Sequence, residues 1–180
     1  MPAEIGYLNP TREAIMEGRP EAKPLMRLAN MAEDLGYDSV WIGGSHENSL
    51  KRAAKHFDGW FPTGPEAQVC GGQWQEVQAY AKAAGRPDGD MTFAVYLTVA
   101  IDDSHENGIA RIDKFLEAYY SVPGHILRRR MASFGGPAEE AAAWIKGYFD
   151  QGASHVCIRF AGDHENSLAA MAKLRTAMGG

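Results

Sequence analysis

The chain has 180 residues, which is enough for one domain of ordinary size with a buried core. With 45% apolar residues, 23% charged residues and a formal net charge of −5, it has the composition of a soluble globular protein, and its acidity argues against non-specific nucleic-acid binding. There is no run of about 18 apolar residues and no signal-peptide pattern at the start, so we expect a cytoplasmic protein that does not span a membrane. The two cysteines, Cys70 and Cys157, form neither a CxxC pair nor a metal-ligand pattern, which fits a reducing compartment.

Short apolar runs alternate with amphipathic segments along the chain. The run at 91–101 is the longest and is rich in residues that favour strands, so we expect it at the centre of a sheet. Five strands are predicted, at 3–8, 38–43, 59–62, 91–101 and 155–160. Six helices are predicted at 24–35, 50–57, 74–84, 109–119, 137–151 and 168–178, with a short helical piece at 126–131.

This alternation predicts an α/β fold with right-handed crossovers and a mostly parallel sheet. The helices fit an open, doubly wound sheet as well as part of a barrel, and the pattern alone leaves both open. No composition shift or long linker divides the chain, so residues 1–180 are expected to form a single domain.

The tripeptide His-Glu-Asn occurs three times at equal intervals of 59 residues. The copies begin at His46, His105 and His164. Each follows a predicted strand and opens a predicted helix, and the preceding residues are good N-caps: Ser45, Ser104 and Asp163. Three explanations remain open: one capping solution used three times, a remnant of duplication, or a triple-histidine metal site. We favour the first, because a glutamate in the first turn also suits the helix dipole, and we predict no metal site.

The turn before the first copy joins a strand end to a helix start through Gly43, Gly44 and Ser45. Backbone N–H groups freed by two glycines at a helix N-terminus can cradle a phosphate, and Ser45 and His46 could add side-chain donors. The same glycines can equally serve only a tight turn, and the sequence is neither a Walker motif nor a GxGxxG fingerprint. We therefore take Gly43, Gly44, Ser45 and His46 as candidate phosphate-binding residues.

Two stretches together resemble the bacterial-luciferase-like monooxygenases, a family of flavin- or deazaflavin-dependent (β/α)8 enzymes. The first stretch is LGYDSVW at 35–41, and the second comprises WIGGS at 41–45 and KRAAKHFDGWFP at 51–62. Residues 91–161 are also similar to the later strands and helices of that family. The resemblance implies a truncated (β/α) TIM-barrel-like fold with about five mostly parallel strands. It also implies a cofactor, reduced FMN or a deazaflavin coenzyme, at the carboxyl ends of the strands.

The family pattern is interrupted at Trp41. In the family the GYDSVW strand comes second and the IGGS turn comes in the second half of the barrel. In this chain the strand continues directly into the turn after Trp41. The resemblance implies that a segment of about a hundred residues or more, with several middle strands of the barrel, is missing at this point. Those strands build much of the cofactor-ring pocket in the family, so the catalytic residues remain unknown.

The resemblance places the turn at Gly43–Ser45, with the helix from His46, against the cofactor phosphate. Arg159 is a further cofactor-binding candidate, because a guanidinium within an apolar strand would need a carboxylate or phosphate partner if buried. Three other residues stand at predicted strand ends, although packing explains the two aromatic ones equally well: Tyr7, Asn9 and Trp60.

Two functions are compatible with these features. The first is a luciferase-like oxidoreductase or monooxygenase that uses reduced FMN or a deazaflavin coenzyme. The second is a non-catalytic shortened relative, or a deletion scaffold, that folds and oligomerises and keeps at most a phosphate or flavin site. Because removing strands from a barrel exposes two sheet edges and part of an apolar interior, a homodimer or higher homo-oligomer is expected.

Overall fold

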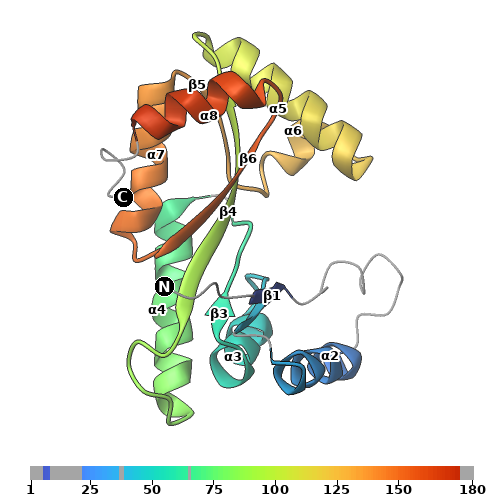
Figure 1. Ribbon diagram of the computed structural model, residues 1–180, viewed down its shortest axis with the longest axis vertical. Helices are drawn as coiled ribbons and strands as arrows, with labels where there is room; N and C mark the ends of the chain where they lie inside the picture. Colours follow the sequence, from blue (N-terminus) through green and yellow to red (C-terminus); the bar gives the residue numbers. More distant parts are fainter. Residues whose placement is uncertain (1–5, 9–21, 37–38, 65, 175–180) are drawn as a thin grey trace. The chain divides into compact units, whose positions relative to one another are not determined.

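A computed structural model of the protein describes residues 6–8, 22–36, 39–64 and 66–174 (Figure 1). Strands and helices alternate along this part of the chain. In chain order they are β1 (Gly6–Leu8), α2 (Ala22–Asp34), β2 (Ser39–Ile42), α3 (Glu47–His56), β3 (Gly59–Trp60), α4 (Ala67–Ala83), β4 (Thr92–Ile101), α5 (His105–Tyr120), α6 (Gly124–Leu127), β5 (Ser133–Gly136), α7 (Ala138–Asp150), β6 (His155–Phe160) and α8 (His164–Lys173).

All five predicted strands have a counterpart in the structure, and a sixth is added. The added strand, β5, has the sequence SFGG, whose two glycines have low strand propensity, so the apolar pattern did not reveal it. The predicted helices are also found, with α4 starting seven residues earlier than expected at Ala67. The predicted start of the first strand at 3–5 and the end of the last helix at 175–178 lie outside the described residues.

The chain divides into two compact units that share α4 and β4. The first unit comprises residues up to 62 together with 73–93. Its strands follow one another in sequential order, β1 to β4, and every pairing among them is parallel. This sequential parallel order is that of a segment of a (β/α) barrel.

The core of the first unit gathers apolar residues from α2, β2, α3, β3, α4 and the start of β4. Trp60 is fully buried and stacks on Phe93 with a centroid distance of 5.2 Å, and Trp74 stacks on the same ring at 5.4 Å. The other residues of this core with 2% exposure or less are Ala29, Val40, Ile42, Leu50, Ala53, Ala54, Phe57 and Val77.

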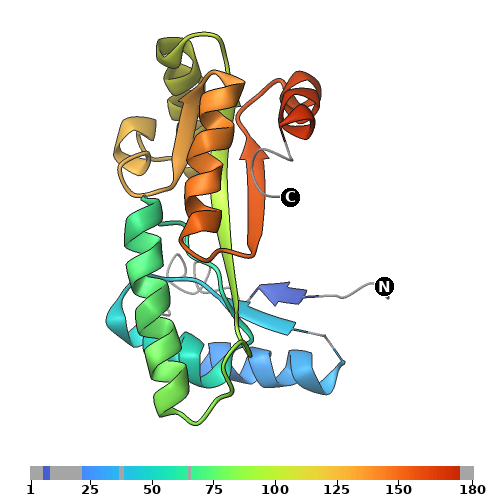
Figure 2. The same cartoon turned by 90° about the vertical axis from the view of Figure 1, so that its left-hand side faces the viewer.

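In the second unit, residues 63–72 and 94–180, β4 lies between two parallel neighbours. β5 pairs with the carboxyl half of β4 on one side, and β6 pairs with residues 94–99 on the other. The chain therefore moves from β4 to β5 and then returns past β4 to reach β6. Because crossovers are right-handed, this reversal places α5 and α7 on opposite faces of the three strands (Figure 2).

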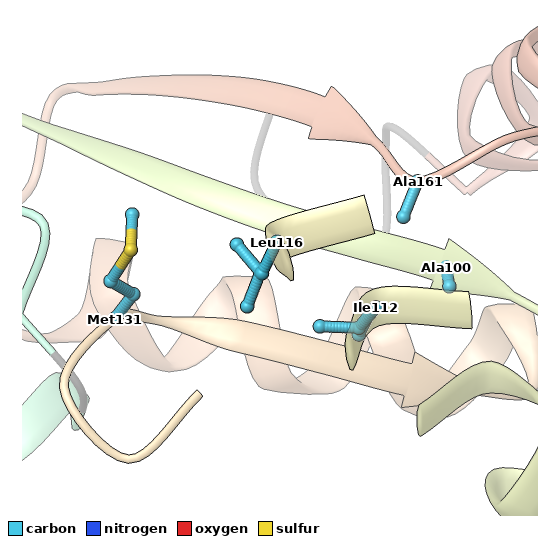
Figure 3. Packing of buried hydrophobic residues seen from close by; sticks show 5 residues of the cluster. All are labelled: Ala100, Ile112, Leu116, Met131 and Ala161. Carbon is cyan, nitrogen blue, oxygen red and sulfur yellow. The ribbon is translucent and has the colours of Figure 1, made fainter. Parts of the chain in front are cut away.

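A tight apolar cluster fixes α5 to its face of these strands. Ile112 and Leu116 of α5 point toward the sheet, where Ala100, Met131 and Ala161 complete the cluster (Figure 3). Glycine makes the approach possible, because a Cβ on Gly108 would stand 2.7 Å from the carbonyl carbon of Gly135 in β5.

The protein thus has an α/β fold with parallel strands, as the sequence predicts. The first unit has the sequential strand order of a barrel, and the second has the two-sided helix arrangement of a doubly wound sheet. Among the helices of the described residues, none combines the length and apolar character needed to cross a bilayer.

Candidate cofactor-phosphate site

The candidate phosphate-binding turn begins where β2 ends, and β2 is firmly held. Val40 and Ile42 are buried with 1% exposure or less. Asp58, which precedes β3, accepts a hydrogen bond from Val40 N at 2.8 Å through its carboxylate and donates its own backbone N–H to Val40 O at 3.0 Å. These contacts fix the strand from which Gly43 emerges.

Two adjacent positions in the turn require glycine. A Cβ on Gly43 would lie 2.9 Å from the carbonyl oxygen of Phe61, a backbone atom that cannot rotate away. Gly44 has φ +107°, and a Cβ there would lie 2.9 Å from Ser49 Oγ. The turn therefore exposes bare backbone directly before a helix, the arrangement that lets an anion approach main-chain N–H groups.

Two side chains from other elements bind the carbonyl oxygens of this turn. The buried Trp60 donates its indole N–H to Gly44 O at 2.9 Å, and Gln73 of α4 donates its amide to Ser45 O at 3.1 Å. With these carbonyls held, the turn keeps one orientation. The Gln73 Oε1 atom is buried and accepts no hydrogen bond within the described residues.

The helix cap differs from the expectation. Ser45 was the predicted N-cap, but α3 begins at Glu47 and His46 is its N-cap, with Nδ1 accepting from Asn48 N at 3.2 Å. The prediction was wrong because the glycine turn extends one residue further before the helix starts. An accepting Nδ1 assigns the proton of the neutral imidazole to Nε2, so His46 can donate outward from that atom.

The first turn of α3 carries an acidic side chain whose charge is balanced locally. Glu47 accepts from Lys51 at 2.7 Å and from the Tyr80 hydroxyl at 3.4 Å, and Lys51 lies 5.3 Å from the centre of the Tyr80 ring. The hydrogen bond from Lys51 lowers the pKa of Glu47, and the same contact raises the pKa of Lys51. Pairing with Lys51 reduces the repulsion that Glu47 would exert on an anion at the turn.

Arg159 has a different environment from the one expected of a buried arginine. It lies on β6 in the second compact unit, whereas Gly43, Gly44, Ser45 and His46 belong to the first, so the structure does not join it to the glycine turn. Its side chain is exposed and its guanidinium stands 5.2 Å from the centre of the Tyr119 ring. An exposed guanidinium stays hydrated, so Arg159 needs no buried anionic partner.

The second and third His-Glu-Asn copies also open helices, as predicted, but their caps differ. Ser104 is the N-cap of α5 and its hydroxyl accepts from Asn107 N at 3.4 Å, as expected. Asp163 holds the N-cap position of α8 in a left-handed conformation and accepts from the Asn166 side chain at 3.0 Å, not from a helix N–H. The three turns therefore share a position in the fold and not a single capping solution.

No group of three or more His, Cys, Asp or Glu side chains in the described ranges could hold a metal ion. The three histidines of the repeated tripeptide are therefore not brought together in one such group. Among the other residues at strand ends, Trp60 is a core residue, while Asn9 and the Tyr7 side chain lie outside the described residues.

Sequence reasoning missed the residues that support the turn from a distance. Gln73 is 28 positions from Ser45, and nothing in the local pattern of α4 distinguishes it from a solvated glutamine. The two hydrogen bonds between Asp58 and Val40 were also missed, although Asp58 lies in the FDGW segment that carries the family resemblance.

Comparison with known proteins shows which family the chain belongs to. The model of the luciferase-like monooxygenases matches residues 40–177, which is more than half of the chain. The protein belongs to this family. The match begins beside Trp41, the position at which the family pattern is interrupted. No curated protein matches the sequence.

Solved structures show the same fold at low sequence identity. The chain is similar to an F420-dependent secondary alcohol dehydrogenase in complex with an F420–acetone adduct, with a TM-score of 0.60 and 12% identity over 76% of this chain and 47% of that one. It is also similar to an EDTA monooxygenase from Chelativorans sp. BNC1, with a TM-score of 0.57 and 14% identity over 78% and 44%. A riboflavin lyase with modified FMN and riboflavin gives 0.57 and 14% over 79% and 44%. The chain therefore spans less than half the length of these structures.

Proposed function

We propose that this protein is a luciferase-like oxidoreductase that binds the phosphate of reduced FMN or of a deazaflavin coenzyme at the turn from Gly43 to His46. The observation that carries the proposal is the bare backbone of Gly43 and Gly44, at positions where a Cβ would not fit, directly before the N-terminus of α3. Membership of the family and the F420 and FMN named in two of the similar structures support the same assignment.

Each residue of the turn has a distinct part in holding the phosphate. The backbone N–H groups of Ser45 and His46 donate to no protein acceptor within the described residues, and both residues are exposed, so these groups are available to an anion. The Ser45 hydroxyl and His46 Nε2–H add side-chain donors. Trp60 and Gln73 bind the carbonyl oxygens of Gly44 and Ser45, so these oxygens are held away from the phosphate. A bound reduced flavin or deazaflavin would supply the redox chemistry, and this chain would bind and orient it.

Substitution at Gly44 tests the site. A valine at this left-handed position is strained by about 1–3 kcal/mol and would also meet Ser49, so the turn should leave its present geometry in Gly44→Val. Cofactor binding should then weaken about tenfold or more. Gly89→Val is the matched control, because Gly89 has φ +83° with open space around its Cβ position, in the loop that precedes β4. Titrations of FMN and of a deazaflavin coenzyme, followed by absorbance and fluorescence, should show weaker binding for the first variant only. Equal affinities for Gly44→Val and the wild type would remove the turn from the proposal while leaving binding itself established.

A second candidate function is a non-catalytic relative. One observation favours it: a cavity of about 310 Å³ in the first unit lies between the end of α4 and the loop before β4, near Trp74, Arg86 and Met91. That is the amino end of β4, whereas barrels of this type bind their ligands at the carboxyl ends. If neither FMN nor the deazaflavin coenzyme binds at tens of micromolar, the oxidoreductase assignment fails and the non-catalytic one is supported.

A further inference from the structure

Strand β6 forms an outer border of the sheet in the second unit (Figure 2). It pairs with β4 along one edge, and no strand in the described part of the chain pairs with its other edge. Ala161 N donates to Val99 O, so by the alternation of a parallel ladder the odd-numbered residues of β6 direct their N–H and C=O groups toward β4. The N–H and C=O groups of Val156, Ile158 and Phe160 therefore point to the free edge.

This edge has little of the protection by which natural sheets prevent pairing with another chain, apart from the exposed charge of Arg159, whose own backbone groups face β4. The sequence HVCIRF contains no proline, no lysine and no glycine, and its pairing with β4 runs without interruption from His155 to Phe160. The residues whose backbone faces outward also carry apolar side chains, of which Val156 and Ile158 are half-buried. Both the backbone and the side chains of this edge are therefore suited to a further strand.

We propose that β6 is the contact between two copies of this chain, paired antiparallel about a two-fold axis at Ile158. In this register Ile158 pairs with Ile158 of the partner subunit, and Val156 pairs with Phe160 of the partner subunit. All three outward-facing residues then exchange hydrogen bonds, and the pair of a β-branched and an aromatic side chain is a favourable one. The two-fold axis closes the assembly at a dimer, because each copy uses its single β6 edge.

The charges on β6 favour this register. On the opposite face Arg159 lies across from Cys157 of the partner subunit, so the two guanidinium groups do not face each other directly. A two-fold axis at Cys157 would instead leave Phe160 across from Ser154 of the partner subunit and place His155 against its Arg159. The axis at Ile158 is therefore the self-complementary choice, and it is independent of the proposed cofactor site.

Proline substitution tests the edge. Ile158→Pro removes one N–H that faces the partner and leaves the groups that face β4 in place, so it suits an edge strand. Light scattering coupled to size-exclusion chromatography should show a dimer for the wild type and a monomer for Ile158→Pro, with the same far-UV circular dichroism. Leu168→Lys is the matched control: it replaces a side chain on α8 that is 60% exposed and should remain dimeric. A monomeric wild type at micromolar concentration would overturn the proposal.

Disulfide trapping tests the register and does not depend on how well the proline variant folds. In a Cys157→Ser background, Ile158→Cys places two thiols in a hydrogen-bonded pair with Cα atoms about 5.5 Å apart, within the range that a disulfide spans. Mild oxidation should give a covalent dimer for the double variant and none for Cys157→Ser alone. Cys70 will not interfere, because it is buried and burial raises the pKa of its thiol to about 11. A wild-type dimer whose double variant gives no covalent dimer would overturn the assignment of the contact to β6.

Discussion

The exposed side chain of His105 connects its own helix, α5, to β5 and α7 in the second unit. Its Nδ1 lies 2.8 Å from Gly135 O at the end of β5, and its Nε2 lies 3.1 Å from Glu140 Oε2 in the first turn of α7. Its ring also contacts Phe134 edge-on, with a centroid distance of 5.8 Å. Only the protonated imidazole donates from both nitrogens, and the hydrogen bond to Gly135, together with Glu140, raises the pKa of His105.

The raised pKa predicts a pH-dependent stability difference. Protonated His105 stabilises the folded state fully below its ordinary pKa of about 6.5, and this contribution is lost as the pH rises through the higher folded value. His105→Asn should therefore reduce the free energy of unfolding at about pH 5 and have less effect at about pH 8.5. Urea unfolding at the two pH values measures this difference. His164→Asn, at the equivalent position of the third copy, is the control, and a loss that is equal at both pH values would contradict the prediction.

The three copies of the tripeptide show what could be predicted at this scale. Their place at the starts of helices followed from the sequence, because capping depends on neighbours along the chain. The partners of His105 could not be predicted, since Gly135 and Glu140 lie 30 and 35 positions away from it. In the candidate site, the glycines of the turn were recognised for the same local reason, whereas Gln73 was not.

At the scale of elements, the contact of α5 with β5 depends on paired glycines. Alanine normally stabilises a helix by about 1 kcal/mol over glycine, but a Cβ on Gly108 would meet backbone atoms of Gly135 and Gly136 at 2.6 to 2.8 Å. Gly108→Ala should therefore destabilise the protein by about 1–3 kcal/mol through overpacking. Gly147→Ala in α7 is the matched case, because its Cβ would meet only Ala67 Cβ at 3.6 Å. Thermal unfolding should move in opposite directions for the two variants, and stabilisation by Gly108→Ala would contradict the close approach.

The elements differed in how readily the sequence revealed them. β4 was predicted closely because it coincides with the longest apolar run of the chain and is rich in residues that favour a strand. β5 was missed, since it is held by its neighbours and not by its own propensity: four residues, two of them glycine, pair with the carboxyl half of β4. Its two glycines allow the close approach of α5, and glycines give no apolar signal.

At the scale of the whole molecule, the two compact units share one strand and one helix. The first two residues of β4 pair with β3, and the following residues pair with β5 and β6. Because β4 must be ordered for either unit to form its pairings, we predict a single cooperative unfolding transition. In Trp144→Phe the three remaining tryptophans, Trp41, Trp60 and Trp74, all lie in the first unit. Their fluorescence and the far-UV circular dichroism of the whole chain should then give the same urea midpoint, and two separate midpoints would contradict it.

The fold class and the family could be predicted from sequence because both rest on local patterns that recur along the chain. The order of the strands could not. Alternating strands and helices are equally compatible with neighbours added on one side and with a reversal, and only the pairing of β6 with β4 decides between them. Whether residues 1–180 act as one domain stays a prediction, and so does the cytoplasmic location.

The return of β6 to β4 has a consequence for synthesis on the ribosome. Ala94 pairs with His155, and the register continues to Val99 and Phe160, so each residue of this ladder emerges 61 positions before its partner. At about 5–20 residues per second, one edge of the central strand waits about 3–12 seconds for the strand that covers it. During that interval Val95, Leu97 and Val99 are not yet paired with β6, although they are fully buried in the finished fold. The nascent chain therefore passes through a stage at which the edge of β4 that pairs with β6 is unpaired and accessible to a chaperone.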